Sequence, residues 1–220
     1  MFRYVLFDLD GTLTDPKAGI TSCVQYALED AGIEEPDLDK LEPFIGPPLA
    51  DSFREFYGFD DEQIKRAIDK YHERFDQKGI FENEIIEGIP ELLKALKDAG
   101  RRVSIASSKP RPLVIRILEH FEIAQYFDTV VGSEFDGRFA TKEAVVEEAL
   151  RQLVPSVYEK EDVAMVGDRK FDIQGARAHG LTGIGVSFGY AGEHELEDAG
   201  SDYIVDTVEE LQRLLLQGCL

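Results

Sequence analysis

A chain of 220 residues suffices for one large domain, or for a core domain that carries a smaller insert. Its formal charge of −20 argues against a nucleic acid polymer or an anionic membrane surface as a partner. The sequence shows no secretion leader, no apolar stretch long enough to span a bilayer and no CxxC pair, because Cys23 and Cys219 lie far apart. We therefore expect a cytoplasmic protein.

The first predicted strand is an apolar run that ends in two carboxylates. Val5, Leu6 and Phe7 lead directly to Asp8, and Asp10 follows two residues later. A short apolar run of this kind predicts a buried strand with Asp8 at its carboxyl end. Two acids this close resist ionising together unless a cation or a proton accompanies them. An ordinary Asp-Gly turn fits the same residues. This stretch alone therefore does not distinguish a functional site from a turn, and the rest of the chain is needed.

The next part of the chain shows helical spacing and no strand-like alternation. Asp15 is the predicted N-cap of a first helix, with Pro16 at its first helical position. Asp60 and Gln63 form the predicted capping box of a longer helix. Because one strand precedes this helical block and the others follow it, we predict an insertion. The predicted bounds are 1–14 and 87–220 for the core domain and 15–86 for the helical domain.

After the helical block, predicted strands alternate with predicted helices. Apolar runs indicate strands at 102–106, 129–131, 163–166, 183–186 and 203–205. Thr207 and Glu210 form the predicted cap of the last helix. Strands and helices that alternate through short loops form a parallel sheet with helices on both faces, so the predicted fold class is α/β.

Polar side chains follow the predicted strands that end at Phe7, Ala106 and Val166. They lie at the edge where an open parallel sheet binds its ligands. They are Asp8, Asp10, Ser107, Ser108, Lys109, Asp168 and Asp172, and Lys142 opens the helix after the third strand. One strand that ends in an acid is unremarkable, because loops are polar. Carboxylates, hydroxyls and lysines that follow several strands together favour a site.

Phosphoryl transfer suits this set of side chains. Asp8 and Asp168 are suited to Mg²⁺, which prefers one or two carboxylates together with water and phosphate oxygens. A carboxylate oxygen in line with a bound phosphate attacks it and forms an aspartyl-phosphate. Asp10 is the candidate acid and base, which protonates the leaving alkoxide and then deprotonates water. Ser107 and Lys142 are predicted to bind the phosphate oxygens.

The order of these motifs resembles that of haloacid dehalogenase-superfamily phosphatases. The matching features are DxDGT at Asp8–Thr12, a strand followed by Ser107, a lysine that opens a helix at Lys142, and GDxxxD from Gly167 to Asp172. The resemblance covers nearly the whole chain and includes the helical insert after the first motif. It implies a Rossmann-like, doubly wound parallel sheet core with an inserted α-helical cap domain.

The resemblance also implies roles for the acids. Asp8 is the expected nucleophile and Asp10 the expected acid and base. Mg²⁺ is expected to be held by Asp8, Asp168 and the backbone carbonyl of Asp10, while Asp172 positions the metal or its water. Dehalogenase members lack the acid at the position of Asp10, which argues against a carbon–halogen hydrolase.

Within the superfamily the chain resembles bacterial phosphoglycolate phosphatases and 5′-nucleotidase-like enzymes. The expected substrate is therefore a small phosphate ester, with phosphoglycolate first and a nucleoside monophosphate as the alternative. A sugar phosphomutase and a non-catalytic interaction protein on the same fold stay open, and we expect a monomer or homodimer. Gly46 and Pro47 lie in a loop that resembles the cap's specificity loop, with a plain interhelix turn as the alternative. Ser108 and Lys109 are further phosphate-binding candidates, with a solvated loop charge as the alternative for Lys109.

Other charged side chains are expected to have no chemical role. For Arg54, exposure to solvent is favoured over contact with a substrate carboxylate. Arg169 and Lys170 are expected to shield charge or to contact a cap residue. The acidic run Glu193–Asp198 is predicted to be a solvated surface, and the histidines show no metal-ligand spacing.

Overall fold

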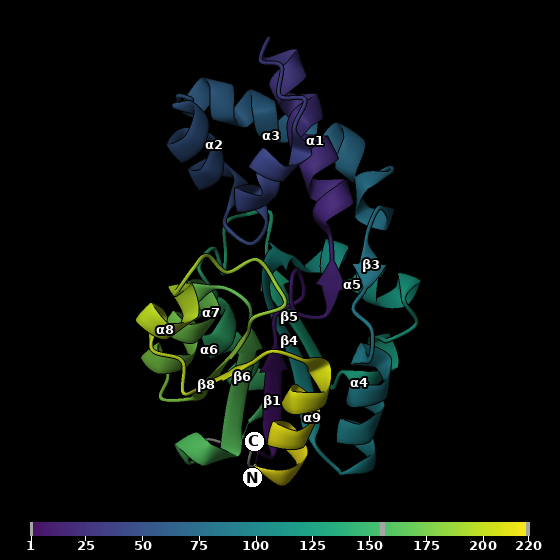
Figure 1. Cartoon of the computed structure of the whole chain (residues 1–220), viewed down its shortest axis with the longest axis vertical. Coiled ribbons are helices and arrows are strands. Elements are labelled where there is room, and N and C mark those ends of the chain that lie inside the picture. Colours follow the sequence, from purple (N-terminus) through teal and green to yellow (C-terminus); the bar gives the residue numbers. More distant parts are fainter. Residues whose placement is uncertain (1, 155–156, 219–220) are drawn as a thin grey trace. The chain divides into compact units, whose positions relative to one another are not determined.

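The chain forms two units in the computed structural model, which describes residues 2–154 and 157–218. The sheet unit comprises the residues up to Thr14 and from Ile85 onward, and the helical unit is Asp15–Glu84 (Figure 1). The chain passes between the units through two short strands, β2 (Thr14–Asp15) and β3 (Glu84–Ile85), which pair with each other.

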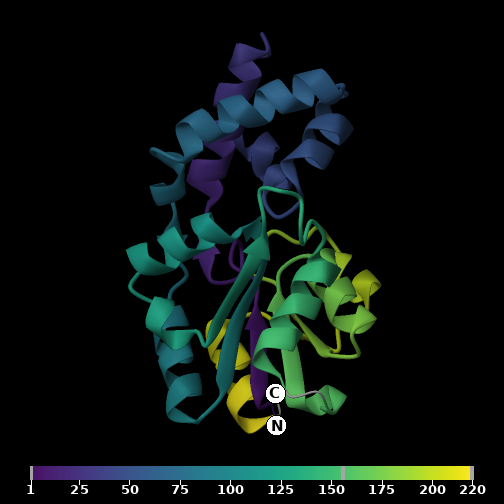
Figure 2. The same cartoon turned by 180° about the vertical axis from the view of Figure 1, so that it is seen from behind.

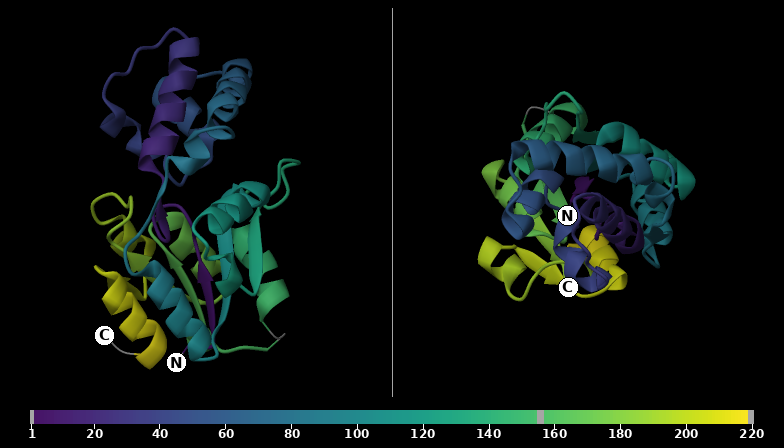
Figure 3. Two further views of the ribbon diagram at one scale, coloured as in Figure 1. Left: turned by 90° about the vertical axis from the view of Figure 1, so that its right-hand side faces the viewer. Right: turned by 90° about the horizontal axis from the view of Figure 1, so that it is seen from above.

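Helices make up the helical unit. Its α-helices are α1 (Lys17–Asp30), α2 (Leu49–Tyr57) and α3 (Asp61–Phe75), and its 3₁₀ helices are η1 (Leu38–Phe44) and η2 (Gly79–Phe81). α1 packs against α3 (Figure 3). The capping box of α3 is confirmed, because the Asp60 carboxylate accepts the N–H of Gln63 and the Gln63 side chain accepts the N–H of Asp60. α1 begins one residue later than predicted, and Asp15 Oδ1 accepts the N–H of Lys17 at 3.0 Å.

The sheet unit is built on six parallel strands in the order β5-β4-β1-β6-β7-β8. The strands are β1 (Tyr4–Phe7), β4 (Arg102–Pro110), β5 (Thr129–Ser133), β6 (Val163–Gly167), β7 (Thr182–Val186) and β8 (Tyr203–Val205). β1 lies between β4 and β6, with Phe7 beside Ile105 and Val166. The residue that follows Phe7 therefore emerges at the centre of the carboxyl edge.

Helices cover both faces of this sheet, which confirms the predicted doubly wound α/β fold. The helices of the sheet unit are α4 (Ile89–Asp98), α5 (Arg111–His120), α6 (Lys142–Leu153), α7 (Lys170–Ala178), α8 (Glu195–Ala199) and α9 (Val208–Gln217), with 3₁₀ turns η3 (Ala124–Tyr126) and η4 (Lys160–Asp162). α6 and α7 lie on one face, and α4 and α9 pack together on the other (Figures 1 and 2). Leu6 and Met165 point toward α6, where they pack among Val145 and Val146. Because side chains alternate along a strand, Val5 and Phe7 are buried on the opposite face.

β4 is longer than predicted, and its extension carries candidate site residues. The prediction ended the strand at residue 106, because Ser107-Ser108-Lys109-Pro110 has the composition of a loop. Pairing with β5 continues to Pro110, with an irregular register after Ser107. A Cβ at Gly132 of β5 would lie 2.5 Å from the carbonyl oxygen of Lys109, so only glycine permits this close approach.

Among the described residues, no helix is long and apolar enough to cross a membrane.

Candidate active site

Asp8 is the first residue beyond β1, at the carboxyl edge of the sheet. Its N–H donates to the carbonyl oxygen of Val166 at 2.9 Å, and its side chain is buried. The chain then turns at Gly11, whose φ is +80°. A Cβ at Gly11 would lie 2.2 Å from Asp168 Oδ2, so glycine is required both by the backbone conformation and by the neighbouring carboxylate.

Lys142 links two of the predicted acids. Its Nζ lies 2.8 Å from Asp8 Oδ1 and 2.8 Å from Asp172 Oδ1, and it donates to the carbonyl oxygen of Ala106 at 3.0 Å. Thr141 caps α6, with Oγ1 accepting the N–H of Ala144, and so fixes the start of this helix at Lys142. Burial opposes the charge of Lys142, but the carboxylates of Asp172 and Asp8 outweigh it and hold the pKa of Lys142 above its usual range.

Asp168 follows β6 and is fully buried. Its Oδ1 accepts the hydroxyl of Thr12 at 3.2 Å, and its Oδ2 accepts the N–H of Tyr190 at 2.8 Å. Burial raises the pKa of Asp168 well above its usual value, and the charges of Asp172 and Asp8 raise it further. Burial likewise raises the pKa of Asp172 to about 6, although the neighbouring charge of Lys142 opposes this shift. Acids gathered in this way beside one ammonium thus resist ionising together unless a further cation joins them.

Three of these acids have the geometry of a cation site. Asp8, Asp168 and Asp172 each offer a carboxylate oxygen, and these oxygens lie within 4.8 Å of one another. All three side chains are buried, where unneutralised charge is costly. Oxygen ligands of this kind fit Mg²⁺, which takes one or two carboxylates and completes its shell with water and phosphate oxygens.

Asp10 lies beside this cluster and pairs with Lys109. The ammonium of Lys109 contacts Asp10 Oδ2, and the two side chains are only 8% and 10% exposed. Asp10 Oδ1 is buried and accepts no hydrogen bond from the described residues. Burial raises the pKa of Asp10, with the charge of Lys109 opposing the shift. The alternative of a solvated loop charge for Lys109 is therefore wrong.

The predicted serines lie at the end of β4. Ser107 is buried, and its Oγ accepts the N–H of Lys109 at 3.3 Å. The carbonyl oxygen of Ser108 accepts the hydroxyl of Ser133 at 2.8 Å, which ties the extended strand to β5. The structure thus brings together on one edge the acids, Lys142 and the Ser107–Lys109 segment.

Residues 5–186 match the model of the "Haloacid dehalogenase-like hydrolase" family. This chain belongs to the haloacid dehalogenase-like hydrolases. The match spans most of the chain and includes both acids of the first motif, so the predicted family is confirmed.

Individual relatives of this hydrolase carry several names. A protein of Pseudomonas aeruginosa named "5′-nucleotidase" is 46% identical over 193 residues, which are 87% of this chain and 86% of that protein. "Tyrosine-protein kinase PtkA" of Mycobacterium tuberculosis is 38% identical over 216 residues, which are 97% of this chain and 72% of that one. The crystal structure of a predicted phosphatase from Clostridium acetobutylicum, 46% identical, covers 99% of both chains with a TM-score of 0.92.

Two other predicted residues of this hydrolase belong to the helical unit. Gly46 and Pro47 lie between η1 and α2, where Gly46 has a φ of +102°. Their role in substrate selection stays a prediction. Arg54 is 54% exposed and pairs with Asp61 at 2.6 Å, which agrees with the favoured solvent-exposed interpretation.

The sequence prediction gave no contact to Thr12, which it named only within the DxDGT motif, or to Tyr190, and it assigned Glu195 to a solvated surface. The acidic run 193–198 was expected to be a solvated surface, but the side chain of Glu195 is only 14% exposed. Its carboxylate pairs with Arg169 at 2.9 Å and accepts the N–H of Lys170 at 2.8 Å. The prediction of a solvated surface is therefore wrong for this acid. A signal was nevertheless present in the sequence. Residues 187–194 follow a predicted strand, so they lie at the same edge of the sheet as the other acids.

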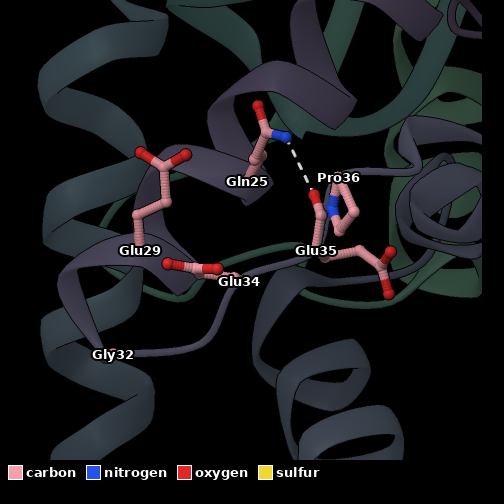
Figure 4. A pocket seen from close by; sticks show the side chains of 6 residues that line it. All are labelled: Gln25, Glu29, Gly32, Glu34, Glu35 and Pro36. Carbon is pink, nitrogen blue, oxygen red and sulfur yellow. Dashed lines mark hydrogen bonds between the residues drawn. The ribbon is translucent and has the colours of Figure 1, made fainter.

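The helical unit contains a separate hollow of about 390 Å³ (Figure 4). It is lined by Gln25, Glu29, Gly32, Glu34, Glu35 and Pro36. Gln25 Nε2 donates to the carbonyl oxygen of Glu35 at 2.8 Å. Because its lining carries carboxylates and no cationic side chain, this hollow is unsuited to a phosphate group.

Proposed function

We propose that this hydrolase is a Mg²⁺-dependent phosphomonoesterase that acts through an aspartyl-phosphate on Asp8. The observation that carries the proposal is the contact of one buried ammonium, that of Lys142, with both Asp8 and Asp172, beside Asp168. Such a set binds an anion and a cation together, as phosphoryl transfer requires. A relative named as a nucleotidase and a neighbouring structure titled as a phosphatase support the same class.

The reaction has two steps. In the first, a carboxylate oxygen of Asp8 forms a bond to phosphorus, the ester P–O bond breaks, and Asp10 gives its proton to the leaving alkoxide. In the second, Asp10 takes a proton from water, whose oxygen attacks the same phosphorus and releases inorganic phosphate and the free Asp8 carboxylate. The raised pKa of Asp10 suits it to hold the proton for the first step.

Neighbouring groups bind and orient the phosphate in this proposal. Ser107 and Lys142 donate to its oxygens, where negative charge spreads in the transition state. Asp8, Asp168 and the backbone carbonyl of Asp10 would hold Mg²⁺, and Asp172 would position the metal or its water. When bound, Mg²⁺ supplies positive charge that offsets the charge of the phosphate.

The helical unit is the proposed cap of this enzyme. Its closure excludes bulk water and presents the Gly46–Pro47 loop to the substrate. Phosphoglycolate and a nucleoside 5′-monophosphate are the two proposed substrates. The sequence resemblance supports the first, and the 46% identity to a protein named 5′-nucleotidase supports the second.

A phosphate-release screen with Mg²⁺ tests the proposal. Wild type, Asp8→Asn and the control Asp98→Asn, which changes an exposed carboxylate of α4, are incubated with phosphoglycolate, nucleoside 5′-monophosphates and sugar phosphates. We expect release of inorganic phosphate by wild type and Asp98→Asn and none by Asp8→Asn. Hydrolysis that survives intact in Asp8→Asn after metal titration shows that the nucleophile is wrong.

Other outcomes of the screen identify other functions. A sugar bisphosphate product in place of inorganic phosphate indicates a phosphomutase. Because one relative is named a tyrosine kinase, a parallel reaction with ATP and a tyrosine-containing protein is included, and transfer of phosphate to that protein replaces hydrolysis as the function. No turnover of any ester points to a non-catalytic protein on this fold.

A further inference from the structure

The loop between β7 and α8, residues 187–194, packs directly on Asp168. The N–H of Tyr190 donates to Asp168 Oδ2 at 2.8 Å. A Cβ at Gly189 would lie 2.3 Å from the Cβ of Asp168 and 2.5 Å from the carbonyl oxygen of Gly11. The orientation of the Asp168 carboxylate therefore depends on where this loop lies.

The carboxylate of Glu195, the residue after this loop, forms hydrogen bonds both with the loop and with the residues that follow Asp168. Its Oε1 accepts the N–H of Lys170 at 2.8 Å and the Nε–H of Arg169 at 2.9 Å, and its Oε2 accepts the N–H of Gly192 at 3.1 Å. The side chains of Arg169 and Glu195 are 12% and 14% exposed. Because both side chains are largely buried, the pair keeps one geometry, and solvent and salt screen its electrostatic attraction little.

Arg169 connects this pair to a second acid of the site. Its backbone N–H donates to Asp172 Oδ2 at 3.0 Å, while its side chain pairs with Glu195. Arg169 thus holds Asp172 directly, through its backbone N–H. It acts on Asp168 indirectly, through Glu195 and the 187–194 loop. Burial raises the pKa of Glu195, but Arg169 and the two backbone N–H groups outweigh this and lower it, so Glu195 is ionised at neutral pH.

We infer that Arg169 and Glu195 are positioning residues that set the affinity of the site for a divalent cation, by fixing the carboxylates of Asp168 and Asp172. The inference rests on the proposed function, because it needs the cation at these acids. Groups that orient metal ligands typically change metal affinity about 10- to 100-fold when they are removed. Asp8 and Lys142 lie outside the pair's contacts, so turnover at saturating Mg²⁺ is expected to change less than Mg²⁺ affinity.

The test measures Mg²⁺ binding to the full chain by isothermal titration calorimetry, without substrate and well below the unfolding temperature. Glu195→Ala and Arg169→Leu remove the two sides of the pair, and Glu197→Ala is the control, because it makes the same change at an exposed position of the same helix. We expect Mg²⁺ to bind about 10- to 100-fold more weakly to the first two variants and unchanged to the control. Glu195→Gln and Arg169→Lys, which keep part of the hydrogen bonding, are expected to bind with intermediate affinity.

Hydrogen exchange provides a readout that needs no metal. In metal-free protein, the amides of residues 187–194 are expected to exchange faster in Glu195→Ala than in wild type or Glu197→Ala. If the alanine and leucine variants fail to fold, Glu195→Gln and Arg169→Lys carry the test.

The outcomes separate this inference from the proposed function. Folded variants that bind Mg²⁺ as tightly as wild type, or a control that weakens binding equally, overturn the positioning role alone. A wild type that binds no Mg²⁺ overturns the metal-dependent function and the inference with it.

Discussion

Lys142 Nζ lies 2.8 Å from Asp8 Oδ1, and the two side chains are 6% and 7% exposed. The same ammonium contacts Asp172 at 2.8 Å. Because this ammonium lies between two buried carboxylates, it neutralises part of the negative charge of the site. The same ammonium is the group that the proposed function assigns to the phosphate oxygens. The stability of the core and the proposed chemistry therefore depend on the same side chain.

Lys142→Met is expected to destabilise the protein when no divalent cation is present. Removing one partner of a buried ion pair costs about 3–5 kcal/mol, because the other partner is left buried and charged. Mg²⁺ replaces part of the missing positive charge, so it should raise the urea midpoint of the variant more than that of wild type. Urea unfolding with a chelator and with Mg²⁺ measures both effects.

Lys160→Met is the matched control for this experiment. Lys160 forms an ion pair with Asp202 at 2.6 Å, but its side chain is 47% exposed, and such pairs contribute little to stability. Equal destabilisation by the two substitutions, or an equal response to Mg²⁺, contradicts the special position of Lys142.

Asp10→Asn is expected to lower the turnover number by about 10²- to 10⁴-fold, the range of general acid–base catalysis. The amide keeps an oxygen for Lys109 but neither protonates the alkoxide nor accepts a proton from water. Both phosphorylation of Asp8 and breakdown of the intermediate should slow. Rapid-quench measurement of phosphorylated enzyme separates the two steps, and undiminished turnover in a variant that unfolds like wild type removes Asp10 from the mechanism.

Gly189→Ala is expected to reduce kcat/KM by about 10²-fold, because a displacement of about 1 Å at a catalytic site has this effect. The added Cβ would lie 2.3 Å from the Cβ of Asp168, so one of the two has to move. Gly183→Ala is the control, since its Cβ meets side-chain atoms of Ile173 and Ala176 no closer than 3.4 Å. Steady-state kinetics of both variants tests this, and equal activities would show that the approach to Asp168 is unimportant.

Asp128→Asn tests how an ion pair away from the site contributes to acid stability. Asp128 accepts the N–H of Val103 and the ammonium of Lys97, each at 2.8 Å, and pairs with Arg102 at 3.0 Å. Burial raises the pKa of this carboxyl, but these partners outweigh it and hold the pKa below its usual value. A depressed carboxyl pKa stabilises the folded state above the unfolded-state pKa of about 3.9, and the benefit disappears as the pH falls through the folded-state value.

The free energy of unfolding should therefore differ most between wild type and Asp128→Asn at neutral pH. The difference should shrink as the pH falls below about 4, where the carboxyl of the unfolded chain becomes protonated, and its charge-dependent part should vanish below the lower folded-state pKa. Urea titrations at several pH values measure it, with Asp98→Asn as an exposed control. A difference that stays constant with pH would show that the charge of Asp128 is not the cause.

Features set by neighbouring residues were predictable from the sequence. The apolar run that ends at Asp8 predicted both a buried strand and an acid at its carboxyl end, because strand burial and chain direction are local properties. The Asp60–Gln63 capping box needs only residues three apart, and so does the cap at Thr207, whose Oγ1 accepts the N–H of Glu210. The alternation of strands and helices after the insert then predicted a parallel sheet with its site at one edge.

Pairings between distant parts of the chain were decided only by the tertiary structure. The sequence gives no measure of which strand lies beside which, so it left the partner of Lys109 open and ended β4 too early, where pairing with β5 extends the strand. It also assigned Glu195 to solvent, because an acidic run is normally exposed. Burial of Glu195 requires the backbone N–H groups of Lys170 and Gly192 and the side chain of Arg169, and folding alone brings these groups to one carboxylate.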